Sequence, residues 1–490
     1  MFFCLRNTLE LDAARPVSDM AAFFGYQPAP SAALTLTLAR EHGCISACLQ
    51  GAEQSFTASE PCSEAAASGD ITRCVKLVVL KVFAELTGLQ PKLPWGILTG
   101  VRPTKLAHKL LDGGVEAAAL PEYLSENYLL PMSQGRLLTD IALKQNHILS
   151  DSTRLTDTGI YIGVPYCPSR CSYCSFPAGI VPQDEESQQN FVNMIEQDLQ
   201  NVVQLIGMHS LRVKSLYIGG GTPGILSPEQ LEKVCSAAEN SFDLSSVREY
   251  TVELGRPDTV TREKLEVLRA HSVDRISINT QTLNDSVLEA VGRKHTAADF
   301  FAAYALAKES GFENINVDLI AGLPGDTLES FKKSVDGVAA LAPANITVHA
   351  LALKSASTLK EHGHAVSEGE TAGKMIDYSH RVLFDSGYIP YYMYRQSRCV
   401  GNLENVGWCK HGTECKYNVF MMEETHTVLA AGAGAVTKLK KPGSSYIERI
   451  FNYKYPYEYN ARFDTLMERK GRISEFYSEI INASQLNADK

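Results

Sequence analysis

No run of apolar residues in this chain approaches the roughly 18 that a membrane-spanning helix needs. The first residues, MFFCLRNTLELDAARP, lack the positive flank, the long apolar stretch and the small-residue cleavage site of a secretory signal. The chain also has fewer basic than acidic residues, with 46 Lys and Arg against 56 Asp and Glu, which gives a formal net charge of -10. This balance argues against broad binding to nucleic acid or anionic membranes, which attract basic surfaces. We therefore expect a cytoplasmic protein.

Low-complexity tracts are missing as well, and the composition is that of a globular protein, with 44% hydrophobic and 21% charged residues. A chain of 490 residues is too long for one ordinary core, which favours several structural units. The pattern predicts an N-terminal accessory domain at residues 1–155, a central α/β domain at 156–355, and a mixed α+β C-terminal domain at 356–490.

The central domain repeats a rhythm of short strand, loop and helix. Strands that alternate with helices imply a parallel sheet, and both a partial barrel and a doubly wound sheet fit six such units. In either architecture the ligand binds at the carboxyl ends of the strands. The predicted strands are GIYIGV (159–164), SLYIGG (215–220), YTVEL (250–254), RISINT (275–280), INVDLI (315–320) and ITVHAL (346–351).

Outside this domain, apolar residues at helical spacing predict a helix at 73–88, with Gly88 as its C-terminal stop. Further helices are expected to begin near Pro103 and to cover 371–388, and PYYMYR (390–395) is strand-like.

Three cysteines, Cys167, Cys171 and Cys174, crowd into eight positions directly after the first central strand. A structural zinc ion would need a distant fourth ligand, because the next candidates are His209 and Cys235. A dithiol pair of Cys171 and Cys174 would leave Cys167 unexplained. An iron-sulfur cubane held by three thiolates explains all three and leaves one iron open, whereas three thiols buried by chance are the fourth alternative.

The C-x3-C-x2-C motif, with Tyr173 before its last cysteine, resembles that of the radical S-adenosylmethionine (SAM) superfamily. The resemblance implies a partial (β/α)6 barrel and a 4Fe-4S cluster bound by Cys167, Cys171 and Cys174. It also implies that SAM chelates the open iron through its amine and carboxylate, and that one electron cleaves the sulfonium to a deoxyadenosyl radical. A reduced donor of the flavodoxin or ferredoxin type would supply that electron.

The same resemblance assigns further positions to cofactor binding. The segment YIGGGTPG matches the glycine-rich segment that receives the methionyl amine, and Glu253 and Asp318 match contacts to ribose or adenosine. For Glu253, a strand-end salt bridge with Arg256 is the alternative. The full set is Tyr161, Tyr173, Gly220, Gly221, Thr222, Glu253, Gln281, Arg293, Asp318 and Ile320.

More closely, YIGVPYC, YIGGGTP, VGRKH and DLIAGLPG resemble the oxygen-independent coproporphyrinogen III oxidase family. LPWGILTGVRPTK, ELGRPDT, GNLENVGW and GAGA resemble its HemZ branch, which has an extra N-terminal domain. This resemblance implies oxidative decarboxylation of two propionates of coproporphyrinogen III, giving protoporphyrinogen IX for haem synthesis.

Two positions depart from the decarboxylating members. Phe176 stands where they have a fourth cysteine, and Gly163 stands where they have a histidine. A related haem-chaperone branch also has Phe at the first of these positions. A non-catalytic haem carrier is therefore the alternative function.

The C-terminal region holds two further groups of residues that each have two interpretations. Cys399, Cys409, Cys415 and His411 either bind a second cluster or haem, or pack as ordinary apolar side chains. The basic stretch either pairs with the carboxylates of a tetrapyrrole or is a solvated face; it consists of Arg395, Arg398, Lys410 and Lys416.

Overall fold

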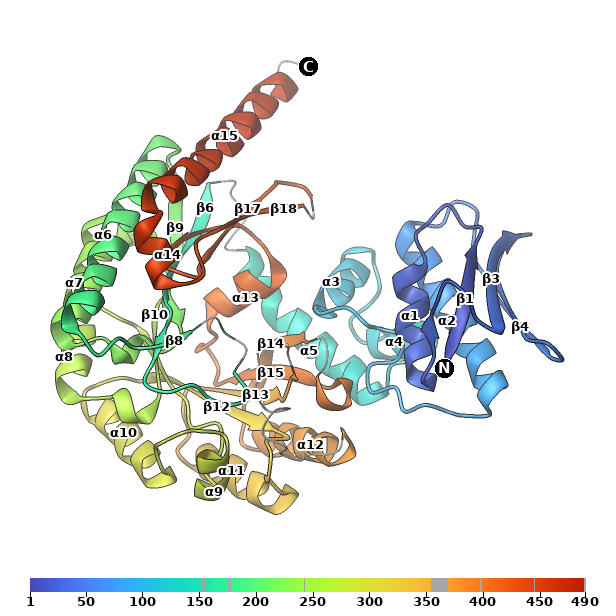
Figure 1. Cartoon of the computed structure of the whole chain (residues 1–490), viewed down its shortest axis with the longest axis horizontal. Helices are drawn as coiled ribbons and strands as arrows, with labels where there is room; N and C mark the ends of the chain where they lie inside the picture. Colours follow the sequence, from blue (N-terminus) through green and yellow to red (C-terminus); the bar gives the residue numbers. More distant parts are fainter. Residues whose placement is uncertain are drawn as a thin grey trace. The chain divides into compact units, whose positions relative to one another are not determined.

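The structure is a computed structural model of the chain (Figure 1). It describes residues 1–150, 156–174, 176, 178–241, 243–353, 369–396, 399–444 and 446–488, with backbone only at 241 and 481–488. The chain divides into two compact units, Met1–Pro103 with Ala107–Thr139, and Thr104–Leu106 with Asp140–Lys490. None of the described helices is both long enough and apolar enough to cross a membrane.

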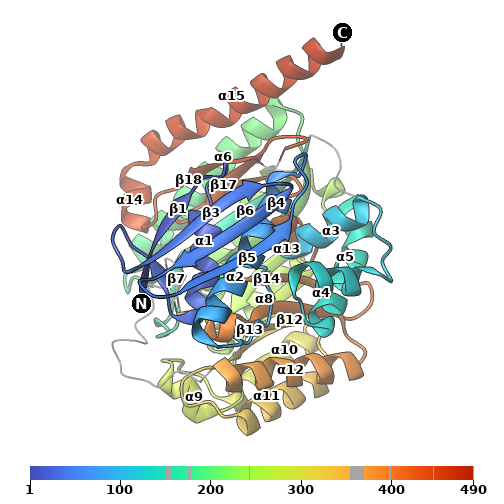
Figure 2. The ribbon, with the colours of Figure 1, turned by 90° about the vertical axis from the view of Figure 1, so that its right-hand side faces the viewer.

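The first unit is built on a five-stranded sheet (Figure 2). Side chains alternate between buried and half-buried along the middle strands, as one covered face requires. Sequence analysis did not identify this sheet. Its order is β2-β1-β3-β4-β5, with β1 (Phe2–Asn7), β2 (Gln27–Pro28), β3 (Leu34–Glu41), β4 (Cys44–Gln50) and β5 (Ser55–Pro61).

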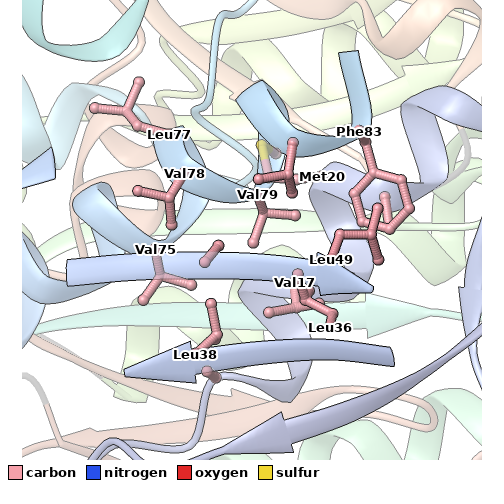
Figure 3. Close-up of a cluster of buried hydrophobic side chains, with 14 of the residues drawn as sticks. Val17, Met20, Leu36, Leu38, Leu49, Val75, Leu77, Val78, Val79 and Phe83 are labelled. Atoms are coloured by element: carbon pink, nitrogen blue, oxygen red, sulfur yellow. The ribbon is translucent and has the colours of Figure 1, made fainter. Parts of the chain in front are cut away.

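Helix α2 (Ser68–Thr87) covers that sheet and confirms the helix predicted at 73–88. Its apolar stripe packs against Leu36, Leu38 and Leu49 of the sheet (Figure 3). The helix ends where Gly88 adopts a left-handed conformation with φ of 67°. The other helices before the second sheet are α1 (Ala14–Ala21), α3 (Thr104–Asp112), α4 (Leu120–Tyr128) and α5 (Met132–Ser150); α3 confirms the predicted start near Pro103.

The second unit contains an eleven-stranded sheet, and all six predicted central strands are confirmed in it as consecutive parallel neighbours. They are β6 (Asp157–Val164), β9 (Arg212–Gly220), β10 (Tyr250–Gly255), β11 (Arg275–Ile278), β12 (Asn314–Ala321) and β13 (Asn345–Ala350).

Helices follow these strands and form an arc outside them, as in the predicted α/β barrel class (Figure 1). Helix α12 also confirms the helix predicted at 371–388. The helices are α6 (Glu185–Met208), α7 (Pro228–Ser241), α8 (Arg262–Ala270), α9 (Asp285–Ala290), α10 (Ala297–Glu309), α11 (Leu328–Ala340) and α12 (Gly369–Asp385).

C-terminal strands extend the same sheet at both sides. β16 (Thr427–Ala431) pairs in parallel with β6 and continues through β17 (Val436–Lys440) to β18 (Ile447–Phe451). At the other side β15 (Glu404–Cys409) runs antiparallel to β13, with β14 (Ile389–Arg395) beyond it. The remaining elements are the small pair β7 (Tyr166–Cys167) and β8 (Gly179–Ile180), and the helices α13 (Lys416–Glu423), α14 (Pro456–Ala461) and α15 (Phe463–Ala488).

Candidate functional site

Six strands of the second sheet each place one half-buried polar or aromatic side chain in their carboxyl-terminal half. In β6 and β13 that residue is the only one of its strand that is not fully buried. We call the set the polar row, and its members contact one another within each half, as described below. Its members are Tyr161, Tyr217, Glu253, Asp318, His349 and Tyr394.

Glu253 is the last member of the first half of the row. The hydroxyl of Tyr217 donates a hydrogen bond to Glu253, and the amide of Gly220 donates another at 3.3 Å. Burial raises the pKa of Glu253 to about 7, although the Tyr217 hydrogen bond lowers it. Glu253 therefore changes charge close to neutral pH.

Three tyrosine rings form a stack next to this carboxylate. The rings of Tyr217 and Tyr417 lie 4.1 Å apart with an interplanar angle of 19°. Tyr161 lies opposite Tyr217 in the register of β6 and β9, and its ring centroid is 6.1 Å away. The first half of the row therefore offers a flat aromatic wall beside an acid.

Asp318 begins the second half of the row. It accepts a hydrogen bond of 2.8 Å from Asn316, and its Oδ2 lies 3.7 Å from Nε2 of His349. Burial alone would raise the pKa of Asp318, but the hydrogen bond and charge of His349 hold it below its ordinary value. On the other side of the imidazole, Nδ1 of His349 lies 3.2 Å from the hydroxyl of Tyr394.

The cysteine loop follows β6 and is tied to the segment after α9. Ser169 donates to the carbonyl of Gly292 at 3.1 Å, and the amide of Ser172 donates to the carbonyl of Val291 at 3.1 Å. The amide of Cys174 donates to the carbonyl of Cys171, which closes a tight turn between these two cysteines.

All three thiols of the loop are half-buried. Burial raises the pKa of Cys167 and of Cys174, so these thiols ionise less readily unless a cation lies nearby. Across the described ranges, no three His, Cys, Asp or Glu side chains are arranged to hold a metal ion. The assignment of Cys167, Cys171 and Cys174 to an iron-sulfur cluster therefore stays a prediction.

The glycine-rich segment at the end of β9 packs directly against the start of the cysteine loop. Gly220 has φ of 118°, and a Cβ atom there would lie 2.9 Å from the carbonyl oxygen of Val164. A Cβ atom on Gly221 would lie 3.0 Å from the sulfur of Cys167, to which the Thr222 hydroxyl donates a hydrogen bond. These positions require glycine because the two segments nearly touch.

The backbone amides of this segment bond within the protein. The Gly220 amide donates to Glu253, the Gly221 amide to Val164 O, and the Thr222 amide to Tyr166 O. The amides of Gly220, Gly221 and Thr222 are therefore already used inside the protein.

Gln281 lies beside Asp318 and has a positive φ of 72°. Its amide donates to the carbonyl of Asp318, and its carbonyl accepts from Ile320, so it bridges to β12. Its side-chain oxygen Oε1 is buried and has no hydrogen-bond partner among the described residues. Buried polar atoms rarely lack a partner, so Gln281 is a candidate position for a bound group.

Arg293 is turned toward the cysteine loop. It donates to the hydroxyl of Tyr173 at 3.2 Å and to the carbonyl of Asn279. Burial alone would lower the pKa of Arg293, but the nearby Tyr173 and Cys171 groups raise it. Ile320 is 7% exposed and belongs to an apolar cluster against which Tyr173 packs.

Arg256 does not pair with Glu253, so the salt bridge considered for that acid is wrong. Arg256 instead forms a salt bridge with Asp258 at 3.0 Å and donates to the hydroxyl of Ser169 at 2.7 Å. Arg256 therefore holds the cysteine loop through Ser169. The distance between these two residues in the sequence gave no signal for this contact.

Gly163, the position that departs from the related decarboxylases, packs against the GAGA segment. A Cβ atom at Gly163 would lie 3.2 Å from both Ala433 O and Ala435 Cβ. Asp198 supports this segment, because it accepts from the Gly432 amide at 3.1 Å and pairs with the buried Lys470. The space that a histidine would need is therefore filled by protein.

The C-terminal cysteines bond to separate neighbours. Cys399 donates to the carbonyl of Ala350, Cys409 to that of Ile389, and Cys415 to Glu249. His411 is exposed.

The residues of the basic stretch also have separate surroundings. Arg395 is 8% exposed and donates to the carbonyl of Asn402. Lys410 donates from its ammonium group to the carbonyl of Ala342, and Lys416 is half-buried. Arg398 lies outside the described residues. The stretch therefore does not form one free basic face from the residues that are described.

Sequence analysis identified Tyr161, Glu253 and Asp318 but missed Tyr217, His349 and Tyr394. Each missed residue lies inside a strand that was predicted. The available signal was a single polar or aromatic side chain near the carboxyl end of an otherwise apolar strand.

A family model described as the radical SAM superfamily matches residues 161–337. The fold is similar to the structure of coproporphyrinogen III oxidase (HemN) from Escherichia coli, with a TM-score of 0.51 and 22% sequence identity. The similar region covers 66% of this chain and 73% of HemN. The parallel sheet, the match to the family model and the similarity to the HemN structure together define a radical SAM fold.

A relative covers almost the whole chain. The oxygen-independent coproporphyrinogen-III oxidase-like protein HemZ of Bacillus subtilis is 36% identical over 479 residues, 94% of this chain and 95% of HemZ. The chain therefore belongs to the coproporphyrinogen-III oxidase-like family of radical SAM proteins that includes HemZ. The heme chaperone HemW of the same organism is 31% identical over 311 residues, which cover 61% of this chain and 77% of HemW.

Proposed function

We propose that this protein is a radical SAM oxidoreductase that converts coproporphyrinogen III to protoporphyrinogen IX without oxygen. Each of two propionate side chains would lose a hydrogen atom, carbon dioxide and one electron, which would pass to a one-electron acceptor, and would become a vinyl group. The observation that carries the proposal is the match to HemZ over 94% of the chain, which includes the first unit as well as the barrel.

The cofactors of this reaction would be a 4Fe-4S cluster and SAM, and the chemistry of the donor atoms in the chain suits both. Cys167, Cys171 and Cys174 supply the soft thiolate donors that iron-sulfur clusters take. The unpartnered Oε1 of Gln281 supplies a buried acceptor for a bound donor group. When bound, the two cofactors supply one-electron chemistry that removes a hydrogen atom from the substrate.

The protein's own residues would position these groups. The Thr222 hydroxyl donates to Cys167, so it would orient that sulfur and draw electron density from it. Glu253 and Asp318 would accept hydrogen bonds from ribose hydroxyls, since both are half-buried acids on the polar row. Arg293 would place a positive charge beside Cys171 and hold Tyr173 over the loop.

A haem chaperone is the second candidate function. Two observations favour it: HemW, named a heme chaperone, is 31% identical over 311 residues, and a fourth cysteine is replaced by Phe176, which is 65% exposed. An exposed aromatic side chain beside the cysteine loop suits a surface that meets a flat apolar ligand. In this function haem would be carried and neither propionate would be altered.

The decisive experiment uses the anaerobically reconstituted full chain with reductant, SAM and coproporphyrinogen III. We expect protoporphyrinogen and deoxyadenosine, both measured by chromatography. Asp318→Asn should lower the rate, whereas Asp336→Asn, which changes an acid bonded to Tyr378 on α12, should not. An intact, reducible cluster with tight haem binding but no tetrapyrrole product would reject the oxidase and favour the chaperone.

The electron donor would be a reduced flavodoxin or ferredoxin. We expect such a protein to replace the chemical reductant in the same assay.

A further inference from the structure

His349 and Tyr394 form the end of the polar row that the cofactor contacts do not use. The side chain of His349 is 23% exposed and that of Asp318 is 19% exposed, so a ligand can reach both. β13 and β14 are not neighbours, because β15 lies between them. Their side chains nevertheless meet, with Nδ1 of His349 3.2 Å from the Tyr394 hydroxyl.

The hydrogen bonds at this end leave one donor available. Gln396 donates its side-chain amide to the hydroxyl oxygen of Tyr394 at 3.3 Å. With its hydrogen on Nδ1, His349 donates to the same hydroxyl oxygen at 3.2 Å. The Tyr394 oxygen then accepts twice, and its own hydrogen points to neither partner. It can be donated to an incoming anion.

The distribution of charge along the row selects where an anion can bind. Glu253 and Asp318 are acids, and His349 is the only basic side chain of the row. Arg293, the nearby alternative, already donates to Tyr173 and Asn279. Asp318 faces Nε2 of His349, so a carboxylate would approach the imidazole on its Nδ1 side, next to Tyr394.

Apolar side chains adjoin this end. Ile320 lies opposite His349 in the register of β12 and β13, and it belongs to a cluster that includes Leu351 and Leu353. Val400 packs against the same cluster. The surroundings therefore suit an anion that is attached to an apolar body.

We propose that His349, Tyr394 and Gln396 form a carboxylate-binding subsite that receives a propionate of the tetrapyrrole. This inference rests on the proposed function and deepens it, since it names the residues that recognise the substrate. Asp318 would link this subsite to the cofactor, because it is the member of the polar row that contacts His349.

The test measures binding of coproporphyrin III, a stable fluorescent relative of the substrate, to the reconstituted holoprotein. The uncharged tetramethyl ester, in the same detergent, is the comparison ligand, and SAM binding is measured in parallel. Tyr394→Phe removes one hydroxyl and His349→Gln removes the imidazole. Tyr378→Phe on α12, whose hydroxyl bonds to Asp336, is the matched control.

We expect Tyr394→Phe and His349→Gln each to weaken coproporphyrin III binding by about tenfold, the size of one lost hydrogen bond to a charged group. Ester and SAM affinities should stay within about twofold, and the control should match the wild type. Equal losses for the acid and the ester would reveal a packing role and overturn the subsite. A loss confined to SAM would assign these residues to the cofactor carboxylate, which also overturns it.

Two further outcomes separate the subsite from the proposed function. If the wild-type protein converts coproporphyrinogen and both variants bind coproporphyrin III normally, the subsite alone is wrong. If the wild-type protein binds neither porphyrin and forms no product, the proposed function is wrong and the subsite falls with it.

Discussion

Tyr217 and Glu253, on the neighbouring strands β9 and β10, are joined by a hydrogen bond from the phenol to the carboxylate. This contact lies within a set of half-buried side chains that runs from Tyr161 to Tyr394 at the carboxyl ends of the barrel strands. The protonation state of Glu253 can therefore be followed through the pH dependence of unfolding.

Glu253 should make the stability of the folded chain fall as the pH rises. Its folded pKa of about 7 lies above the ordinary value of 4.5, so between these two pH values the folded state keeps a proton that the unfolded state has lost. The free energy of unfolding therefore declines from pH 4.5 to pH 7. Urea unfolding should show a smaller decline for Glu253→Gln.

Tyr217→Phe is the companion variant. Since the Tyr217 hydrogen bond lowers the pKa of Glu253, its loss should extend the decline to higher pH. Identical pH profiles for Glu253→Gln and the wild type would show that this acid is not protonated in the folded state.

Replacement of Cys167, Cys171 or Cys174 with Ala should abolish iron loading, because two remaining thiolates hold a cubane poorly. Iron and sulfide analysis of anaerobically reconstituted protein measures this. Cys48→Ala, on the half-buried face of β4, should keep its iron. Normal iron in any one of the three loop variants would contradict the cluster assignment.

Gly220→Ala and Gly221→Ala should have different effects on the two cofactors. A side chain at Gly220 meets the Val164 carbonyl and should weaken SAM binding while iron loading persists. A side chain at Gly221 comes within 3.0 Å of the Cys167 sulfur and should lower iron content as well.

Gly373→Ala is the control for both, because a Cβ atom there meets nothing within 4 Å and the residue lies in α12. It should raise the free energy of unfolding by about 0.5–1 kcal/mol. Calorimetric titration with SAM and iron analysis check all three variants. Equal iron content in Gly220→Ala and Gly221→Ala would contradict the different effects expected for these two positions.

Lys470→Met should destabilise the second unit by about 3–5 kcal/mol, because it leaves the buried Asp198 carboxylate without its cation. Asp198→Asn in the same chain should recover part of that loss. Denaturant unfolding measures both. Since Asp198 also accepts from the Gly432 amide, the single variant should loosen the segment beside Gly163, and hydrogen exchange at Gly432 should rise.

The barrel could be predicted because its strands are short apolar runs separated by clear helices, as INVDLI and ITVHAL illustrate. The five-stranded sheet of the first unit could not, since β5 (SFTASEP) is largely polar and β1 pairs in parallel with β3 across an intervening helix. Tyr161, Glu253 and Asp318 were identified through motifs. The His349–Tyr394 contact crosses a strand that enters the sheet later in the sequence, so only the topology places these two residues together.

Thr158 on β6 donates its hydroxyl hydrogen to the carbonyl of Thr427 on β16, although these residues come from opposite ends of the second unit. During synthesis, β6 leaves the ribosome long before β16 is made, so one edge of the nascent barrel must wait unpaired. Such distant pairing slows folding and leaves a strand edge open to wrong partners. A ribosome-bound chain that stops short of β16 should therefore expose the edge of β6 and engage chaperones.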